Sequence, residues 1–199
     1  MVSSPAVSSR PFPPSRERLI QTAATLFYER GIHRTSVDLV VAEAGLTKPT
    51  FYKSFPSKDD LIEAVARYRS DNWHRAIEEE IAAATTPRQR LIAVFIFLEK
   101  FIADEGFRGC ALVNASVEIH IATGPGREVA RQNKLENRRR LTRLAEEAGL
   151  PNPEPLAATL ALLFEGAITS AYVEGDIDAG RVARRAAEAL ISDRGANAN

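Results

Sequence analysis

Apolar positions along this chain recur every three or four residues, which is the spacing of one face of an α-helix. The first such segment, 15–30, has an apolar face and ends at Gly31, a typical helix terminator. Further helices are predicted over 58–84, 87–104, part of 106–126, 126–149, 156–173 and 178–191. No segment alternates apolar and polar residues as a half-buried strand does. The pattern therefore predicts an all-α protein.

Two very short helices with a turn between them are predicted from residue 35 onward. Thr35 and Ser36 can cap the first, and the Thr35-x-x-Asp38 spacing fits a capping box. Gly45 supplies the backbone freedom that a tight turn requires. Thr47 can cap the second helix. This arrangement is a helix-turn-helix.

The second short helix has an apolar side and a polar side. Phe51 and Phe55 are expected to face inward, while Lys48, Thr50, Tyr52 and Lys53 face outward. A two-turn helix that exposes cations, a hydroxyl and a phenol contributes little to a core but suits the DNA major groove. The pattern therefore favours DNA recognition.

Ordered motifs run through this region of the chain. They are the Ala23–Phe27 run, Gly31, the Thr35-Ser36 cap, Ala44-Gly45, Thr47-Lys48-x-Thr50-x-Tyr52-x-x-Phe55 and Ser57-Lys58-x-x-Leu61. On these motifs, residues 16–62 resemble the N-terminal DNA-binding domain of the TetR family of transcriptional regulators. The resemblance implies a three-helix helix-turn-helix domain, joined by a long helix to a C-terminal helical domain for ligand binding and dimerisation.

The exposed face and the resemblance together predict the DNA-binding residues: Thr35, Ser36, Lys48, Pro49, Thr50, Tyr52, Lys53 and Lys58. Lys58 is expected, by resemblance, to contact a backbone phosphate. Pro49 stands where the family often has glycine or another small residue, and it removes one amide donor. The alternative for Lys48 and Lys53 is that they are solvated surface lysines.

The formal net charge is zero, but the charge is distributed unevenly. Residues 1–58 carry 8 Lys and Arg against 4 Asp and Glu, a net charge of +4, and the remainder carries −4. Such an asymmetry concentrates positive potential at the end of the chain that is predicted to meet phosphates. The zero total therefore does not argue against DNA binding.

Four regions are expected from composition. They are a disordered Ser/Pro arm (1–14), the helix-turn-helix domain (15–62), the ligand-binding and dimerisation domain (63–192) and a disordered tail (193–199). No run of about eighteen apolar residues is apparent, so no membrane span is expected. The N-terminus lacks the apolar centre of a secretory signal, and the single cysteine is compatible with the cytosol. The predicted location is cytoplasmic.

Family members bind an inducer among the helices of the C-terminal domain. A mixed aromatic and polar set is the candidate lining here: Trp73, Phe97, Phe101, Cys110, Asn114, His120, Phe164 and Tyr172. The alternative is that these are ordinary core and interface residues. Two roles remain open for Cys110, a redox sensor and an inert thiol. No neighbouring cation is predicted that would activate the thiol.

The resemblance also implies a two-fold dimer built from the last two long helices. The candidate interface residues are Leu156, Leu160, Leu163, Ala167, Ala171, Val182, Ala186 and Leu190. A symmetric dimer places two recognition helices about one DNA turn apart, so the operator is expected to be a palindrome.

The Arg138–Arg140 run is interpreted as a solvated face.

An enzyme requires a constellation of reactive groups, and the sequence offers none. The three histidines lie far apart, without the spacing of a metal site, and Cys110 and His120 lack an identifiable third partner. We therefore expect no catalysis, no metal and no cofactor.

The sequence predicts a DNA-binding regulator, most simply a repressor released by a small molecule. The rivals are a helical ligand- or partner-binding protein with a vestigial helix-turn-helix and a helical enzyme that uses Cys110 or His120.

Overall fold

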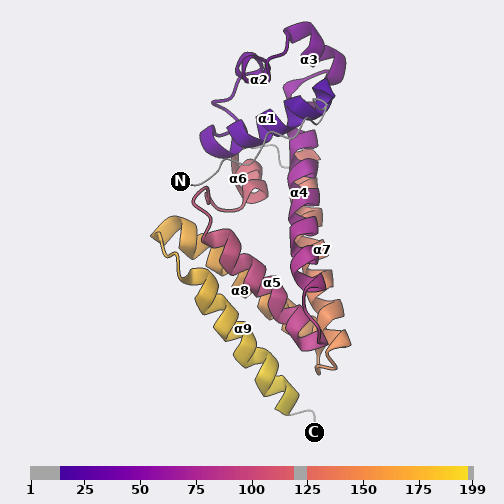
Figure 1. Cartoon of the computed structure of the whole chain (residues 1–199), viewed down its shortest axis with the longest axis vertical. Helices are drawn as coiled ribbons and strands as arrows, with labels where there is room; N and C mark the ends of the chain where they lie inside the picture. The colour runs from indigo at the N-terminus through magenta and orange to yellow at the C-terminus, as the bar shows by residue number, and fades with distance from the viewer. Residues whose placement is uncertain (1–13, 119–124, 197–199) are drawn as a thin grey trace, which may run out of the picture. The chain divides into compact units, whose positions relative to one another are not determined.

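The computed structural model describes residues 14–118 and 125–196, which form nine helices and contain no strand (Figure 1). The all-α prediction is confirmed. The helices are α1 (Ser15–Arg30), α2 (Val37–Glu43), α3 (Lys48–Ser54), α4 (Lys58–Ala82), α5 (Pro87–Ile102), α6 (Ala111–Glu118), α7 (Pro125–Glu147), α8 (Pro153–Glu174) and α9 (Ala179–Ala196). The chain divides into two compact units, the first ending at Val65 and the second beginning at Ala66.

The C-terminal end differs from the sequence prediction. Helix α9 continues to Ala196, so the expectation of disorder is wrong for residues 193–196. One reason is that the Arg194 guanidinium donates a hydrogen bond to the carbonyl oxygen of Pro151, over 3.4 Å. The rest of that tail, and residues 1–13 of the predicted arm, lie outside the described residues.

The first unit is built around the apolar face of α1, which packs against α2 and α3. Its buried side chains include Leu19, Ile20, Ala23, Leu26, Phe27, Val40, Val41, Phe51 and Phe55. Gly45 has φ +61°, the left-handed conformation that glycine adopts without steric cost, and it makes the turn after α2. The Arg18 side chain donates to the carbonyl oxygen of Ala44 and so ties α1 to this turn.

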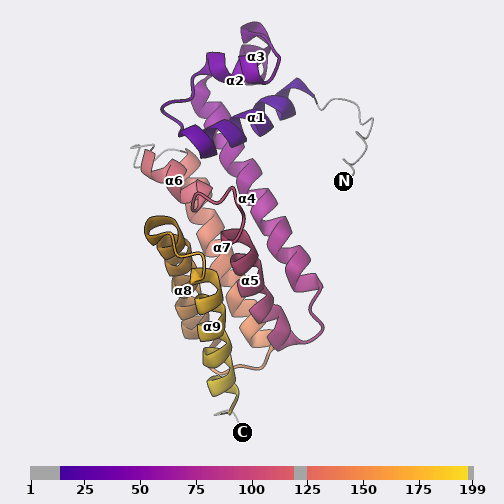
Figure 2. The same ribbon diagram turned by 60° about the vertical axis from the view of Figure 1, so that its left-hand side comes forward.

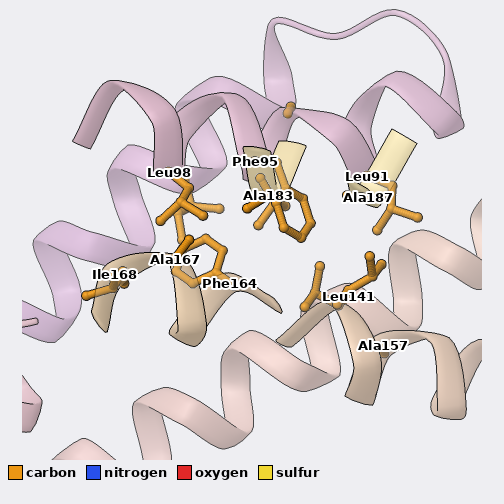
Figure 3. Close-up of a cluster of buried hydrophobic side chains, with 14 of the residues drawn as sticks. Leu91, Phe95, Leu98, Leu141, Ala157, Phe164, Ala167, Ile168, Ala183 and Ala187 are labelled. Carbon is orange, nitrogen blue, oxygen red and sulfur yellow. The ribbon is translucent and has the colours of Figure 1, made fainter. Parts of the chain in front are cut away.

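The second unit has α5 at its centre. Helix α5 packs against α7, α8 and α9, and α8 also packs against α7 and α9; Figure 2 shows α8 and α9 side by side. Phe95 and Phe164 are fully buried where α5 meets α8, within the apolar cluster drawn in Figure 3. The continuous burial along α5 explains why its sequence is apolar on nearly all sides.

Small residues bring α9 close to α5. Ala179, Ala183 and Ala187 lie four residues apart on one buried side of α9. Beside them, a Cβ atom at Gly180 would lie 2.8 Å from the Cα of Glu99 on α5. The backbones therefore approach more closely than any larger residue at position 180 would allow.

Part of the second unit is held by a buried polar network between α4 and α7. Arg140 is 6% exposed, and its Nε donates to a Glu78 carboxylate oxygen over 2.7 Å. Its Nη2 lies 3.1 Å from Nδ1 of His74, and the other ring nitrogen of His74 lies 3.2 Å from the side-chain amide of Asn133. The interpretation of Arg138–Arg140 as a solvated face is therefore wrong for Arg140, because α4 supplies partners that the local sequence does not show.

This network sets the protonation of His74. Burial and the positive charge of Arg140 hold the pKa of His74 below its ordinary value, against the opposing effect of Glu136, Asp71 and Glu78. Arg140 is always cationic and can only donate, so Nδ1 of His74 accepts and carries no proton. The neutral ring is therefore the form that fits this contact.

Candidate nucleic-acid interface and ligand-binding region

The recognition helix α3 separates its residues as the sequence predicts. Phe51 and Phe55 are 0% and 2% exposed, whereas Tyr52 is 56% exposed. Lys48, Pro49 and Lys53 are also exposed. The phenol ring of Tyr52 rests edge-on against Phe51, with 5.2 Å between ring centroids. A rigid apolar side thus anchors a solvent-facing polar side.

Residues at the start of α3 are fixed by a local cap. Thr47 Oγ1 accepts a hydrogen bond from the backbone N–H of Thr50 over 3.4 Å, and the two hydroxyl oxygens lie 2.9 Å apart. The predicted N-cap at Thr47 is confirmed. Thr50 is half-buried, and its hydroxyl is engaged with Thr47.

The cap of α2 is one of the two residues that the sequence proposes. Ser36 is the N-cap, and its Oγ accepts from the backbone N–H of Leu39 over 3.1 Å. Thr35 is 0% exposed and donates its hydroxyl to the carbonyl oxygen of Gly31 over 2.7 Å. The predictions that Thr35 forms the capping box and that its side chain contacts DNA are therefore wrong, because this side chain is committed to the interior of the first unit.

Asp38, which the capping-box interpretation assigned elsewhere, has a different partner. Its Oδ1 lies 2.8 Å from Nζ of Lys48, and the two side chains are 64% and 59% exposed. The hydrogen bond to Asp38 and its negative charge raise the pKa of Lys48. The pair joins α2 to the first residue of α3, and the spacing in sequence gave no sign of it.

Lys58 also has an internal partner. Its Nζ donates to the carbonyl oxygen of Ile32 over 2.6 Å, and the side chain is half-buried. An ammonium group has three donors, so this contact is compatible with a phosphate contact but does not require one. The contact gives Lys58 a role in holding the loop after α1.

Four of the predicted ligand residues meet in one aromatic cluster. The indole of Trp73 on α4 makes edge contacts with the rings of Phe97 and Phe101 on α5, both at 4.9 Å between centroids, and with Phe164 on α8 at 6.0 Å. Phe164 is fully buried, while the other three are half-buried. The rings pack against one another edge to face, as aromatic side chains do in a protein core.

The other predicted ligand residues have separate surroundings. Cys110 is 8% exposed, and its Sγ lies 3.5 Å from Nζ of Lys134, the neighbouring cation that the sequence did not predict. Asn114 donates its side-chain amide to the carbonyl oxygen of Arg108 over 2.8 Å. Tyr172 is 55% exposed. His120 lies outside the described residues.

The Lys134 ammonium is also bound to a carboxylate. Its Nζ donates to both carboxylate oxygens of Glu165, over 2.7 and 2.8 Å. Burial lowers the pKa of Lys134, but the neighbouring Cys110 and Glu165 outweigh that effect and leave it raised. The lysine therefore stays charged beside the thiol.

Two cavities in the second unit are lined by none of the seven predicted ligand residues that the structure describes. One of about 570 Å³ lies between the ends of α4, α5 and α9, and its apolar wall includes Ile92, Ile96 and Ile191. The other, of about 290 Å³, lies between α4 and α7, and Ser70, His74 and Asn133 line it. Within the described parts of the chain, no group of three or more His, Cys, Asp or Glu is placed to hold a metal ion.

The predicted dimer residues divide between two sides of α8 and α9. Leu156 and Leu160 are 0% exposed, and Ala167 and Ala171 are also buried, so these four face the core of their own unit. Their assignment to a dimer interface is wrong, because a buried side chain has no area left for a partner. Leu163, Ala186 and Leu190 are half-buried, and Val182 is 59% exposed.

The outer side of α8 is apolar as well. Leu162 and Val173 are each 74% exposed, and Ile177 just beyond the helix is 68% exposed. By length and composition alone, α8 is long and apolar enough to cross a membrane. One such helix is weak evidence for a membrane span, since core helices of soluble proteins can be equally long and apolar.

Comparisons with known proteins cover both units. A family model described as "Bacterial regulatory proteins, tetR family" matches residues 19–65, and one described as "Tetracyclin repressor-like, C-terminal domain" matches residues 87–187. The chain is 33% identical over 95 residues to the transcriptional activator FasR of Mycolicibacterium smegmatis, covering 47% of this chain and 43% of FasR. It is 32% identical over 81 residues to the repressor KstR2 of the same organism, covering 41% and 40%. These matches span about two fifths of the length of each relative.

Solved structures match over nearly the whole chain. A TetR-family regulator from Streptomyces coelicolor superposes with a TM-score of 0.84 at 26% identity, covering 90% of this chain and 95% of that one. A putative TetR transcriptional regulator from Streptomyces avermitilis gives 0.78 at 28% identity, covering 92% and 98%. With both family models matched and this fold, the chain belongs to the TetR family of DNA-binding transcriptional regulators.

Proposed function

We propose that this regulator binds a palindromic operator as a homodimer, acts as a cytoplasmic repressor and is released from DNA by a small molecule. The observation that carries the proposal is the division of α3 into a buried apolar side and an exposed polar side. Lys48, Pro49, Tyr52 and Lys53 form the exposed recognition surface of α3, and Thr50 is half-buried beside them. Ser36, the exposed N-cap of α2, is a further candidate DNA contact. A short, rigidly anchored helix of this kind fits the major groove.

The homodimer is supported by the apolar outer side of α8. Leu162, Gly166, Thr169 and Val173 are all exposed and share one face of the helix. Exposed apolar patches on soluble domains mark interaction sites, and Val182 on α9 is a further exposed apolar residue. A second copy of the chain, paired through this face about a two-fold axis, would remove the patch from water and present two recognition helices.

A repressor is the simpler mode of action, but the two named relatives differ, since one is called an activator and the other a repressor. Release by a ligand would be a population shift, in which the ligand binds better to the conformation with low DNA affinity. The two cavities of the second unit are candidate binding sites for such a ligand.

The test is to select DNA from a random library with the purified protein and to measure its affinity for the selected sequence at several salt concentrations. We expect a palindromic sequence bound by two copies, with a large excess of affinity over random DNA. Lys53→Ala should lower the salt slope by about one unit. Lys100→Ala, which removes an exposed lysine from the second unit, is the control and should leave the slope unchanged.

Weak binding with no selected sequence would contradict the proposal and favour a ligand- or partner-binding protein with a vestigial helix-turn-helix. Sedimentation of the free protein tests the dimer separately. A monomer at concentrations well above those used for binding would contradict the proposed α8 interface.

A further inference from the structure

An ion pair spans the two helices of the helix-turn-helix on its exposed side. The Asp38 carboxylate comes from the first turn of α2, and the Lys48 ammonium comes from the first residue of α3. The two groups are 2.8 Å apart, and more than half of each side chain is exposed to solvent. Pairs this exposed contribute little to stability, because water and salt screen the attraction between the two charges. Holding the fold together is therefore a weak explanation for the pair.

The pair has a larger effect on the charge of the recognition surface. Helix α3 carries two cations, Lys48 and Lys53, and the Asp38 carboxylate neutralises one of them. Sequence-independent DNA affinity depends on the number of phosphates that cations neutralise, and each contact adds about 0.9 to the salt slope. A paired Lys48 contributes less to that attraction than an unpaired one.

We propose that Asp38 is a specificity-determining residue that keeps Lys48 out of sequence-independent phosphate contacts, an inference that rests on the DNA-binding function proposed above. In a loosely docked complex, solvent still separates the DNA phosphates from the Lys48 ammonium. Such a phosphate attracts the ammonium less than the Asp38 carboxylate does at 2.8 Å. In a fully seated complex, base edges come within hydrogen-bonding distance and compete with Asp38. A lysine then donates to guanine, and a carboxylate can accept from cytosine.

Asp38→Asn is the direct test, because it keeps the shape of the side chain and removes the charge. Asp59→Asn is the matched control, since Asp59 is an exposed carboxylate in the first turn of a helix in the same unit. Each variant is measured against the selected operator and random DNA at about 50 and 200 mM salt. Circular dichroism confirms that both variants are folded.

We expect Asp38→Asn to add one phosphate contact to the random-DNA complex. Its random-DNA affinity should then fall by an additional factor of about 3.5, relative to wild type, between these two salt concentrations. The operator should gain less affinity than random DNA, so the ratio of the two affinities falls. In a Lys48→Ala background, Asp38→Asn should do no more than the control substitution.

Two results would overturn the inference while leaving the proposed function intact. One is that Asp38→Asn and Asp59→Asn raise random and operator affinities by the same factor, which would mean that only net charge matters. The other is that the effect of Asp38→Asn persists without Lys48. If wild-type protein selects no sequence and shows no salt-dependent binding, the proposed function fails and this inference fails with it.

Discussion

Helices α3 and α7 both carry cationic and hydrogen-bonding side chains, but α3 exposes them to solvent, whereas α7 buries some of them inside its own unit. Lys48, Tyr52 and Lys53 of α3 are exposed, whereas Asn133 and Arg140 of α7 are 3% and 6% exposed. The contacts of α3 that fix its cap lie three residues apart, while Arg140 finds His74 sixty-six residues away. A polar residue therefore reveals its role in the sequence only when its partners are local.

The largest effect that tests this comparison comes from two adjacent aromatic residues of α3. Phe51→Ala should lower the free energy of unfolding by about 3–5 kcal/mol, because Phe51 is fully buried. Tyr52→Ala should change it by less than about 1 kcal/mol and lower DNA affinity instead, since its ring is mostly exposed. Urea unfolding followed by circular dichroism measures both. Equal losses would mean that α3 does not have distinct buried and exposed sides.

A smaller effect is expected from two adjacent arginines of α7. Arg140→Ala removes the partner of Glu78 and a donor to His74, and it should cost about 1–3 kcal/mol. The loss stays below that of a fully buried pair because the Glu78 side chain is 49% exposed and can be solvated. Arg139→Ala, at a side chain 69% exposed, should stay within about 0.5 kcal/mol. Similar values for the two variants in urea unfolding would contradict the buried network.

The smallest effect is the pH dependence that His74 brings to the same network. Because its pKa is lowered in the folded state, the unfolded chain binds the proton more readily, and stability is lost as the pH falls through the ordinary value of 6.5. We therefore expect the free energy of unfolding to drop between about pH 8 and pH 5.5 by more in wild type than in His74→Asn.

An identical pH dependence in wild type and His74→Asn would show that burial and Arg140 do not hold the pKa of His74 below its ordinary value.

Local chemistry explains which parts of the structure the sequence predicts. The Thr47 cap, the Gly45 turn and the buried pair Phe51 and Phe55 involve residues close in the chain, and all four appear as expected. The sequence left both Thr35 and Ser36 open as caps of α2, because both residue types are good cap formers. The hydrogen bonds decide between them, since Thr35 donates to the carbonyl oxygen of Gly31 and Ser36 accepts from the backbone N–H of Leu39.

Helix α8 shows why the proposed dimer surface could not be located from the pattern. Its apolar residues cover both sides, so periodicity does not distinguish Leu156 and Leu160, which face the core, from Leu162 and Val173, which face outward. The Asp38–Lys48 pair was missed for a related reason, since a turn separates its members. Contacts between helices set both features, and they do not follow from the spacing of residues within one helix.

The aromatic cluster provides the protein with a spectroscopic probe of one unit. Trp73 is the single tryptophan of the chain, and its indole lies against Phe97, Phe101 and Phe164 in the second unit. Fluorescence excited where tyrosine does not absorb therefore reports on the second unit alone, while circular dichroism reports on the helices of both. If the two signals give the same unfolding curve, the units unfold together, and if they separate, each unit has its own stability.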